Sequence, residues 1–199
     1  MSRNIIVCGV GGQGTILASK LISAAAMAKG IAVKSAETIG MAQRGGSVFS
    51  HIRMGDEAEC PMIAAGTADI LLAFEPGEAV RMLPYLKKGG LVIVSERPVM
   101  PVTAALAGAD YNGGEMLEYL QRKAGRVIVA DTEKACRELG SSRIVNLLLL
   151  GIAAASGELG LTAEDIRQAV QSKVPPKFHE LNFRALDYAA GLWQQECLQ

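Results

Sequence analysis

The fold is decided by a short stretch near the start of the chain, residues 5–14, which reads Ile5-Ile6-Val7-Cys8-Gly9-Val10-Gly11-Gly12-Gln13-Gly14. Its first residues are apolar and mostly β-branched, as in a strand that is buried on both faces of a parallel sheet. The rest has the Gly-x-Gly-x-x-Gly spacing that carries a chain through a tight turn into a helix N-terminus. The stretch therefore predicts a strand, a glycine turn and a helix, the opening unit of a nucleotide-binding fold.

Two interpretations of the turn stay open. Its backbone N–H groups and the helix dipole suit a phosphate, so the turn could bind a nucleotide or another anion. Alternatively, the glycines serve only the tight turn and close packing of the helix on the strand. The residues concerned are Gly9, Gly11, Gly12, Gln13 and Gly14, and Gln13 stands where such turns usually carry an aliphatic side chain. Glu37, at the end of the expected second strand, is a candidate for ribose hydroxyls, although it comes somewhat late for that role.

The next polar tract combines a loop from Gly40 to Gly46 with an alternating strand from Ser47 to Met54. A strand where a helix would be expected predicts that the sheet contains mixed strand directions. Arg44 could grip a phosphate or carboxylate through its guanidinium fork, or form a salt bridge at an interface. We expect His51 to be a hydrogen-bonded strand histidine, because no serine or carboxylate stands at a diagnostic spacing from it. The candidate residues of this tract are Gln43, Arg44, Gly45, Gly46 and His51.

Further along, apolar runs alternate with helical patterns. Strands are expected at residues 31–36, 69–74, 91–95 and 126–130, with Gly89-Gly90 as the turn into the strand at 91–95. Helices are expected at residues 13–29, 78–85, 115–124, 132–139, 146–155, 162–170 and from 177 onward. Asp131 and Thr162 are expected N-caps. Since no stretch between these expected strands and helices resembles a linker, we expect one domain over residues 1–199. The predicted class is α/β: a three-layer α/β/α, Rossmann-like fold with a mostly parallel, mixed sheet.

Composition excludes several classes of function. The chain has 20 basic and 20 acidic residues, so no net field attracts nucleic acid or an anionic membrane. The longest apolar run, residues 144–155, is too short to cross a bilayer. Four dispersed cysteines, Cys8, Cys60, Cys136 and Cys197, provide neither zinc nor iron–sulfur spacing, so no metal site is expected. A strand that begins almost at once leaves no room for a secretory signal, and we expect a cytoplasmic protein.

A resemblance to a known family is carried by three groups of residues. These are the glycine turn at 9–14, the tract Glu37-Thr38-x-Gly40-Met41-Ala42-Gln43-Arg44-Gly45-Gly46, and Ser50-His51-Ile52-Arg53. Together they resemble the gamma-type domain of the 2-oxoacid:ferredoxin oxidoreductases. The similarity continues through Leu139-Gly140, Arg143, Asn146 and Leu150-Gly151 to Asn182, so it covers essentially the full chain.

The resemblance implies one subunit of an enzyme that oxidatively decarboxylates a 2-oxoacid, with indolepyruvate or another aryl pyruvate expected, to an acyl-CoA while reducing ferredoxin. Thiamine diphosphate and iron–sulfur clusters are then expected in a larger partner subunit, with coenzyme A as co-substrate and no cofactor held by this chain. The resemblance assigns no catalytic residue here. It implies that the isolated chain is inactive, and surplus apolar surface could pair it with a second copy.

Two other functions remain open on the residues alone. A stand-alone nucleotide-binding oxidoreductase would use the glycine turn for pyrophosphate and Glu37 for ribose. A non-catalytic assembly subunit would use the same loops only for contacts with its partner.

Overall fold

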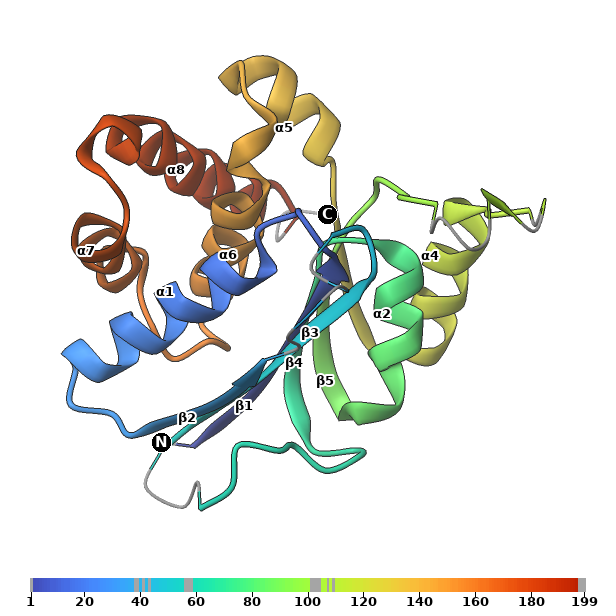
Figure 1. The fold of residues 1–199 in the computed structure, drawn as a ribbon, viewed down its shortest axis with the longest axis horizontal. Helices are drawn as coiled ribbons and strands as arrows, with labels where there is room; N and C mark the ends of the chain where they lie inside the picture. The colour runs from blue at the N-terminus through green and yellow to red at the C-terminus, as the bar shows by residue number, and fades with distance from the viewer. Residues whose placement is uncertain are drawn as a thin grey trace.

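The computed structural model describes residues 2–37, 40, 42, 44–55, 59–100, 105–106, 108 and 110–196, with side chains as far as residue 194. Its centre is a six-stranded sheet in the order β2-β3-β1-β4-β5-β6 (Figure 1). The strands are β1 (Arg3–Val10), β2 (Val33–Glu37), β3 (Ser47–Met54), β4 (Ala68–Ala73), β5 (Leu86–Ser95) and β6 (Arg126–Ala130). The prediction of an α/β fold is confirmed.

The sheet has mixed strand directions, as the sequence predicted. β1, β4, β5 and β6 pair in parallel, and Val7 lies opposite Leu72 in the β1–β4 register. β3 runs antiparallel to β1 on one side and to β2 on the other, with Ile52 opposite both Ile5 and Ser35. The short connection from β2 to β3 requires this reversal, because a parallel crossover needs a dozen or more residues.

Helices cover both faces of the sheet and give the expected three layers (Figure 1). One face carries α1 (Thr15–Ala28), α5 (Thr132–Leu139), α6 (Val145–Ala155), α7 (Ala163–Lys173) and α8 (His179–Glu196), whereas the other carries α2 (Pro76–Met82) and α4 (Gly113–Lys123). α6 is buried along almost its whole length, since α8 packs against it from outside the sheet. A Cβ on Gly151 would lie 2.6 Å from Ala189 Cβ, so this glycine permits the close α6–α8 approach.

Several helix ends follow local signals in the sequence. The Asp131 side chain caps α5 by accepting a hydrogen bond from Lys134 N, and α5 ends at Gly140 with a left-handed φ of 73°. Thr162 and Asp165 form a reciprocal capping box at the start of α7. These caps fix the helix starts that the sequence predicted.

Other expected boundaries were wrong. β2 begins at Val33 instead of Ile31, and the helix expected over residues 78–85 is α2, followed by a 3-10 turn at Leu83–Tyr85. Gly89 and Gly90 were expected to turn the chain into a strand. Gly89 does have a left-handed φ of 76°, and the register against β4 changes between Ala68 and Ile70, but β5 already starts at Leu86, before the glycines. In the described part of the chain, no helix is both long enough and apolar enough to span a membrane.

Candidate functional site

The β1–α1 turn needs glycine for two different reasons. Gly12 and Gly14 have φ values of 103° and 91°, a left-handed conformation that side chains rarely adopt. Gly9 instead lies in the strand, where a Cβ would come within 2.8 Å of Phe74 Cβ and 2.6 Å of Gln13 Oε1. Glycine is therefore required at Gly12 and Gly14 by the backbone conformation, and at Gly9 by close packing.

The Gln13 side chain closes this turn from within. Its Oε1 accepts a hydrogen bond from Val10 N at 2.6 Å, and its Nε2 donates to Phe74 O at 3.1 Å. The amide thus joins the carboxyl ends of β1 and β4. An aliphatic residue at this position could make neither bond, which explains the unusual glutamine.

The glycine turn and the second glycine loop lie against each other. Gly11 N donates to Gly46 O at 2.8 Å, and Gly45 N donates to Gly11 O at 3.1 Å. Arg44 is exposed beside this contact. Gln43, also a candidate, lies outside the described residues. The structure therefore brings the two predicted loops together at one end of the sheet.

Glu37 and His51 lie apart from that contact. Glu37 accepts a hydrogen bond from Ser19 Oγ at 3.0 Å and lines a groove beside α1 that does not include the glycine turn. His51 is buried in β3, where Nδ1 accepts a hydrogen bond from Ile63 N at 3.0 Å. Burial lowers the pKa of His51, so the ring is neutral at pH 7 and its Nε2 carries the hydrogen. Glu37 and the glycine turn thus line different cavities, and His51 is enclosed within the sheet.

A crevice of about 480 Å³ lies over the carboxyl ends of β1, β4, β5 and β6. Ligands of open α/β sheets bind in this position, where α1 and α2 depart to opposite faces of the sheet. The lining residues come from the glycine turn, the strand ends and the segment that enters α6: Gly12, Gln13, Gly14, Leu17, Phe74, Ser95, Arg97, Val99, Thr132, Ser142, Arg143, Val145 and Asn146.

The crevice is lined by hydrogen-bond donors and positive charge. Its charged lining residues are Arg97 and Arg143, both exposed, and its lining contains no carboxylate. The first turn of α1 has no side-chain cap at Gly14, which leaves backbone N–H groups open at this end. Asn146 is buried, and its Nδ2 lies 3.3 Å from the position of a Cβ built on Gly14. These groups together suit an anionic ligand.

Sequence reasoning did not select Arg97, Arg143 or Asn146 as site residues, although the last two contributed to the family resemblance. A usable signal was present, because Arg97 follows the predicted strand at residues 91–95, and ligand-binding residues gather after the strands of such a sheet. The position of Arg143 before α6 gave no comparable signal. Only the packing of α6 on the sheet brings it to the crevice.

Two carboxylates meet beside the crevice, at the ends of β5 and β6. Burial and a hydrogen bond shared with Asp131 raise the pKa of Glu96 to about 7. A hydrogen bond from Lys134 N helps to keep the pKa of Asp131 below its usual value. The pair therefore shares a proton that resides on Glu96 below about pH 7.

Two further carboxylates are buried on the other face of the sheet and hold loops in place. Glu75 Oε1 accepts a hydrogen bond from Tyr111 Oη at 2.8 Å, and its Oε2 accepts one from Glu78 N at 2.8 Å. Glu78 accepts a hydrogen bond at 2.5 Å from the hydroxyl of Ser47, the residue after the Gly45–Gly46 pair. Burial and the bond to Glu75 raise the pKa of Tyr111 above its usual range. The second glycine loop is thereby tied to α2.

The described cysteines do not form a ligand set for an iron–sulfur cluster. Cys8 is buried in β1, Cys60 is exposed after β3, and Cys136 lies in α5, while Cys197 is outside the described residues. Within the described part of the chain, no three histidine, cysteine, aspartate or glutamate side chains are grouped so that they could hold a metal ion.

Comparison with known proteins identifies relatives along nearly the whole chain. The family described as pyruvate ferredoxin/flavodoxin oxidoreductase matches residues 4–192. Indolepyruvate oxidoreductase subunit IorB of Pyrococcus horikoshii is 38% identical over 186 residues, which cover 92% of each chain.

Solved structures share the fold. The gamma subunit of a keto/oxoacid ferredoxin oxidoreductase from Geobacter sulfurreducens superposes with a TM-score of 0.70 at 23% identity, over 97% of this chain and 99% of that one. The 2-oxoglutarate:ferredoxin oxidoreductase of Magnetococcus marinus has a TM-score of 0.71 at 21% identity, over 98% of this chain but 31% of that longer chain. The match to the family over residues 4–192 and the 38% identity show that the chain belongs to the pyruvate ferredoxin/flavodoxin oxidoreductase family.

Proposed function

We propose that this chain is the smaller subunit of an indolepyruvate-type 2-oxoacid:ferredoxin oxidoreductase. The observation that carries the proposal is the 38% identity to an indolepyruvate oxidoreductase subunit across 92% of both chains. Identity of this extent over nine-tenths of both chains favours the same place in a similar complex. We propose that the whole chain acts there as one gamma-type domain.

The reaction converts a 2-oxoacid and coenzyme A to an acyl-CoA and carbon dioxide, and releases a proton and two electrons that reduce ferredoxin. The larger subunit is proposed to hold the thiamine diphosphate and the iron–sulfur clusters, with ferredoxin docking on the complex. The separated thiols of Cys8, Cys60 and Cys136 support this division of labour. We also propose that the protein is cytoplasmic and that it binds neither nucleic acid nor a membrane.

Coenzyme A is the proposed ligand of the crevice. The solved relative from Magnetococcus marinus contains bound coenzyme A and succinyl-CoA. In this chain, Arg97, Arg143 and the open first turn of α1 could receive its phosphates. Arg143→Ala should raise the KM for coenzyme A about tenfold or more and leave the KM for the 2-oxoacid within twofold, because a lost charged hydrogen bond costs about 1.5–3 kcal/mol.

The second glycine loop is the proposed contact with the larger subunit. Arg44 is exposed there, and Ser47 fixes the base of the loop through its bond to Glu78. The backbone contact between Gly11 and the Gly45–Gly46 pair would carry partner binding directly to the edge of the crevice. The loop would thus link assembly of the complex to ligand binding.

A stand-alone nucleotide-binding oxidoreductase is less favoured by the geometry. Such an enzyme needs its ribose-binding acid in the same cavity as the glycine turn. Glu37 instead lines a different groove and accepts a hydrogen bond from Ser19. A pure assembly subunit would leave the donor-lined crevice without a ligand, and coenzyme A titration separates that alternative from the proposal.

The proposed function is tested by anaerobic co-purification with the product of the neighbouring gene. The expected result is a stable complex that reduces a viologen dye only when a 2-oxoacid and coenzyme A are both present. A panel of indolepyruvate, phenylpyruvate, pyruvate and 2-oxoglutarate then identifies the oxoacid. A complex that forms but reduces the dye with none of these acids would contradict the proposal, as would failure of the two chains to associate.

A further inference from the structure

β2 is an edge strand with one side open. Gly55 N donates to Ala32 O at 2.9 Å, just before β2 pairs with β3, so the Ala32 carbonyl points toward β3. Because backbone groups in an antiparallel pair alternate in direction, the N–H and C=O groups of Val33, Ser35 and Glu37 point away from β3. No further strand pairs with that side in the described part of the chain. These groups form a free hydrogen-bonding edge.

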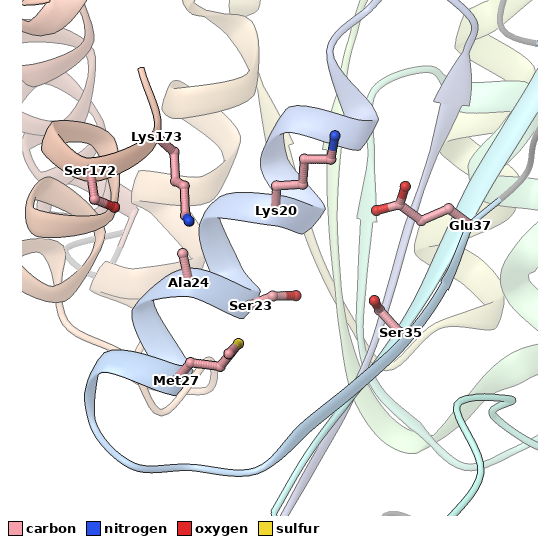
Figure 2. A pocket seen from close by; sticks show the side chains of 8 residues that line it. All are labelled: Lys20, Ser23, Ala24, Met27, Ser35, Glu37, Ser172 and Lys173. Carbon is pink, nitrogen blue, oxygen red and sulfur yellow. The ribbon is translucent and has the colours of Figure 1, made fainter. Parts of the chain in front are cut away.

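A groove of about 680 Å³ lies beside this edge. Its lining comes from the outward ridge of α1, from β2 and from the end of α7: Lys20, Ser23, Ala24, Met27, Ser35, Glu37, Ser172 and Lys173. Figure 2 shows Ser35 and Glu37 reaching from β2 toward α1, with Lys173 on the other side of that helix. A helix that flanks an open edge strand is the arrangement by which PDZ-type domains receive an extended peptide.

The groove is positively charged with an apolar floor. Lys20 and Lys173 are exposed and have no acidic partner among the residues that the structure describes. The one carboxylate of the lining, Glu37, already accepts the Ser19 hydroxyl. Between the lysines, Met27 is 66% exposed and Ala24 is half-buried. Met27 and Ala24 therefore form a small apolar strip between two positive charges.

We propose that the groove between α1 and β2 receives an extended segment of the larger partner subunit, which adds to the sheet as a strand beside β2. The segment alternates apolar side chains, which cover Met27 and Ala24, with acidic ones that meet Lys20 and Lys173. This inference rests on the proposed function, because it assumes the hetero-oligomer. It places the contact at the sheet edge, separate from the Arg44 loop.

Charge favours the partner subunit over a second copy of this chain. Two copies joined through β2 would bring four groove lysines together with only two groove carboxylates, both of which already accept serine hydroxyls. Such a pair would leave positive charge uncompensated. An acidic segment from a different chain would neutralise it.

Hydrogen exchange gives a direct test with the intact complex. In the isolated chain, the amides of Val33, Ser35 and Glu37 should exchange quickly, and in the complex they should be protected at least about tenfold, since they donate to the added strand. Unchanged exchange in an assembled, active complex would overturn the inference and leave the proposed function standing. Protection of the same amides in the isolated chain, with dimer formation, would replace the partner segment by a second copy and overturn it as well.

Variants test separately the contributions of the lysine charges and of the β2 backbone hydrogen bonds to affinity for the larger subunit. Lys20→Glu with Lys173→Glu should weaken binding to the larger subunit at least about tenfold and reduce its salt dependence. The matched control is Lys88→Glu with Lys123→Glu, which changes net charge equally on exposed sites elsewhere. Ser35→Pro should also weaken binding, because it removes an outward N–H while leaving the β2–β3 ladder intact. Equal affinity of the groove and control double variants would overturn the proposal, whether or not Ser35→Pro folds.

Discussion

Replacing Gln13 by leucine removes both hydrogen bonds that close the β1–α1 turn. The side chain keeps its approximate size but can no longer accept from Val10 N or donate to Phe74 O, bonds of 2.6 Å and 3.1 Å. Both backbone groups belong to buried residues, so water cannot easily replace the lost partner. The variant therefore isolates the contribution of the glutamine amide.

The magnitude follows from leaving two buried polar groups unpaired. Each costs about 1–3 kcal/mol, and additional apolar burial by leucine returns about 1 kcal/mol. We expect the free energy of unfolding to fall by roughly 2–4 kcal/mol, which lowers Tm by roughly 5–15 °C in a chain of this size. Because the turn also lines the crevice, affinity for coenzyme A in the complex should fall too.

Urea denaturation measures the loss, and hydrogen exchange at the Val10 amide locates it. The matched control is Gln121→Leu, which makes the same exchange on the exposed side of α4 and should stay within about 0.5 kcal/mol of the wild type. If Gln13→Leu were as stable as that control, the amide would not hold the turn, and our account of this glutamine would be refuted.

Three further predictions concern neighbouring positions. Gly9→Ala should lower the free energy of unfolding by about 1–3 kcal/mol, because its Cβ would meet Phe74 Cβ at 2.8 Å; a melting curve that matches the wild type would contradict this. The pKa of Glu96 in the folded protein is about 7, above its ordinary value of 4.5. The protonated carboxyl therefore contributes its full stabilisation of the fold below about pH 4.5, and this contribution is lost as pH rises through about 7. Glu96→Gln should therefore gain stability relative to the wild type between pH 5 and pH 8, by about 1 kcal/mol after solvent screening, and a constant difference across that range would exclude the shared proton. Arg44→Ala should leave the melting temperature of the isolated chain unchanged but weaken binding to the larger subunit at least about tenfold, as measured by titration; unchanged affinity and turnover would return Arg44 to a solvated surface role.

Local sequence signals predicted the elements whose structure is set locally. Strand β3 occupies Ser47–Met54 as its alternating pattern indicated, and Asp131 and Thr162 cap α5 and α7. The same reasoning missed that pairing begins before Gly89 and Gly90. The chain bulges there, with a left-handed φ of 76° at Gly89, but Leu86 already pairs with Ala68 of β4, so the glycines lie within β5. That pairing is a long-range event with no trace in the local pattern.

The candidate site was less predictable than the fold. The glycine turn was recognisable because its spacing is local, and the structure places it against Gly45 and Gly46. Arg97 and Arg143 reach the crevice from separate segments. Arg97 follows a predicted strand, whereas nothing in the neighbourhood of Arg143 distinguishes it from a surface arginine. Glu37 shows the opposite case. Its position in the sequence suggested a ribose-binding acid, but it lines a different groove from the crevice at the glycine turn.

The central claim, that this chain completes a 2-oxoacid:ferredoxin oxidoreductase, is tested most directly by adding it to its purified larger subunit. Anaerobic dye reduction is followed with indolepyruvate and coenzyme A present while this chain is titrated in. The account predicts that each protein alone is inactive and that activity rises with added chain to a plateau at a fixed ratio of the two subunits. Full activity of the larger subunit alone would contradict the account. So would the absence of activity at every ratio of the subunits with indolepyruvate, phenylpyruvate, pyruvate and 2-oxoglutarate.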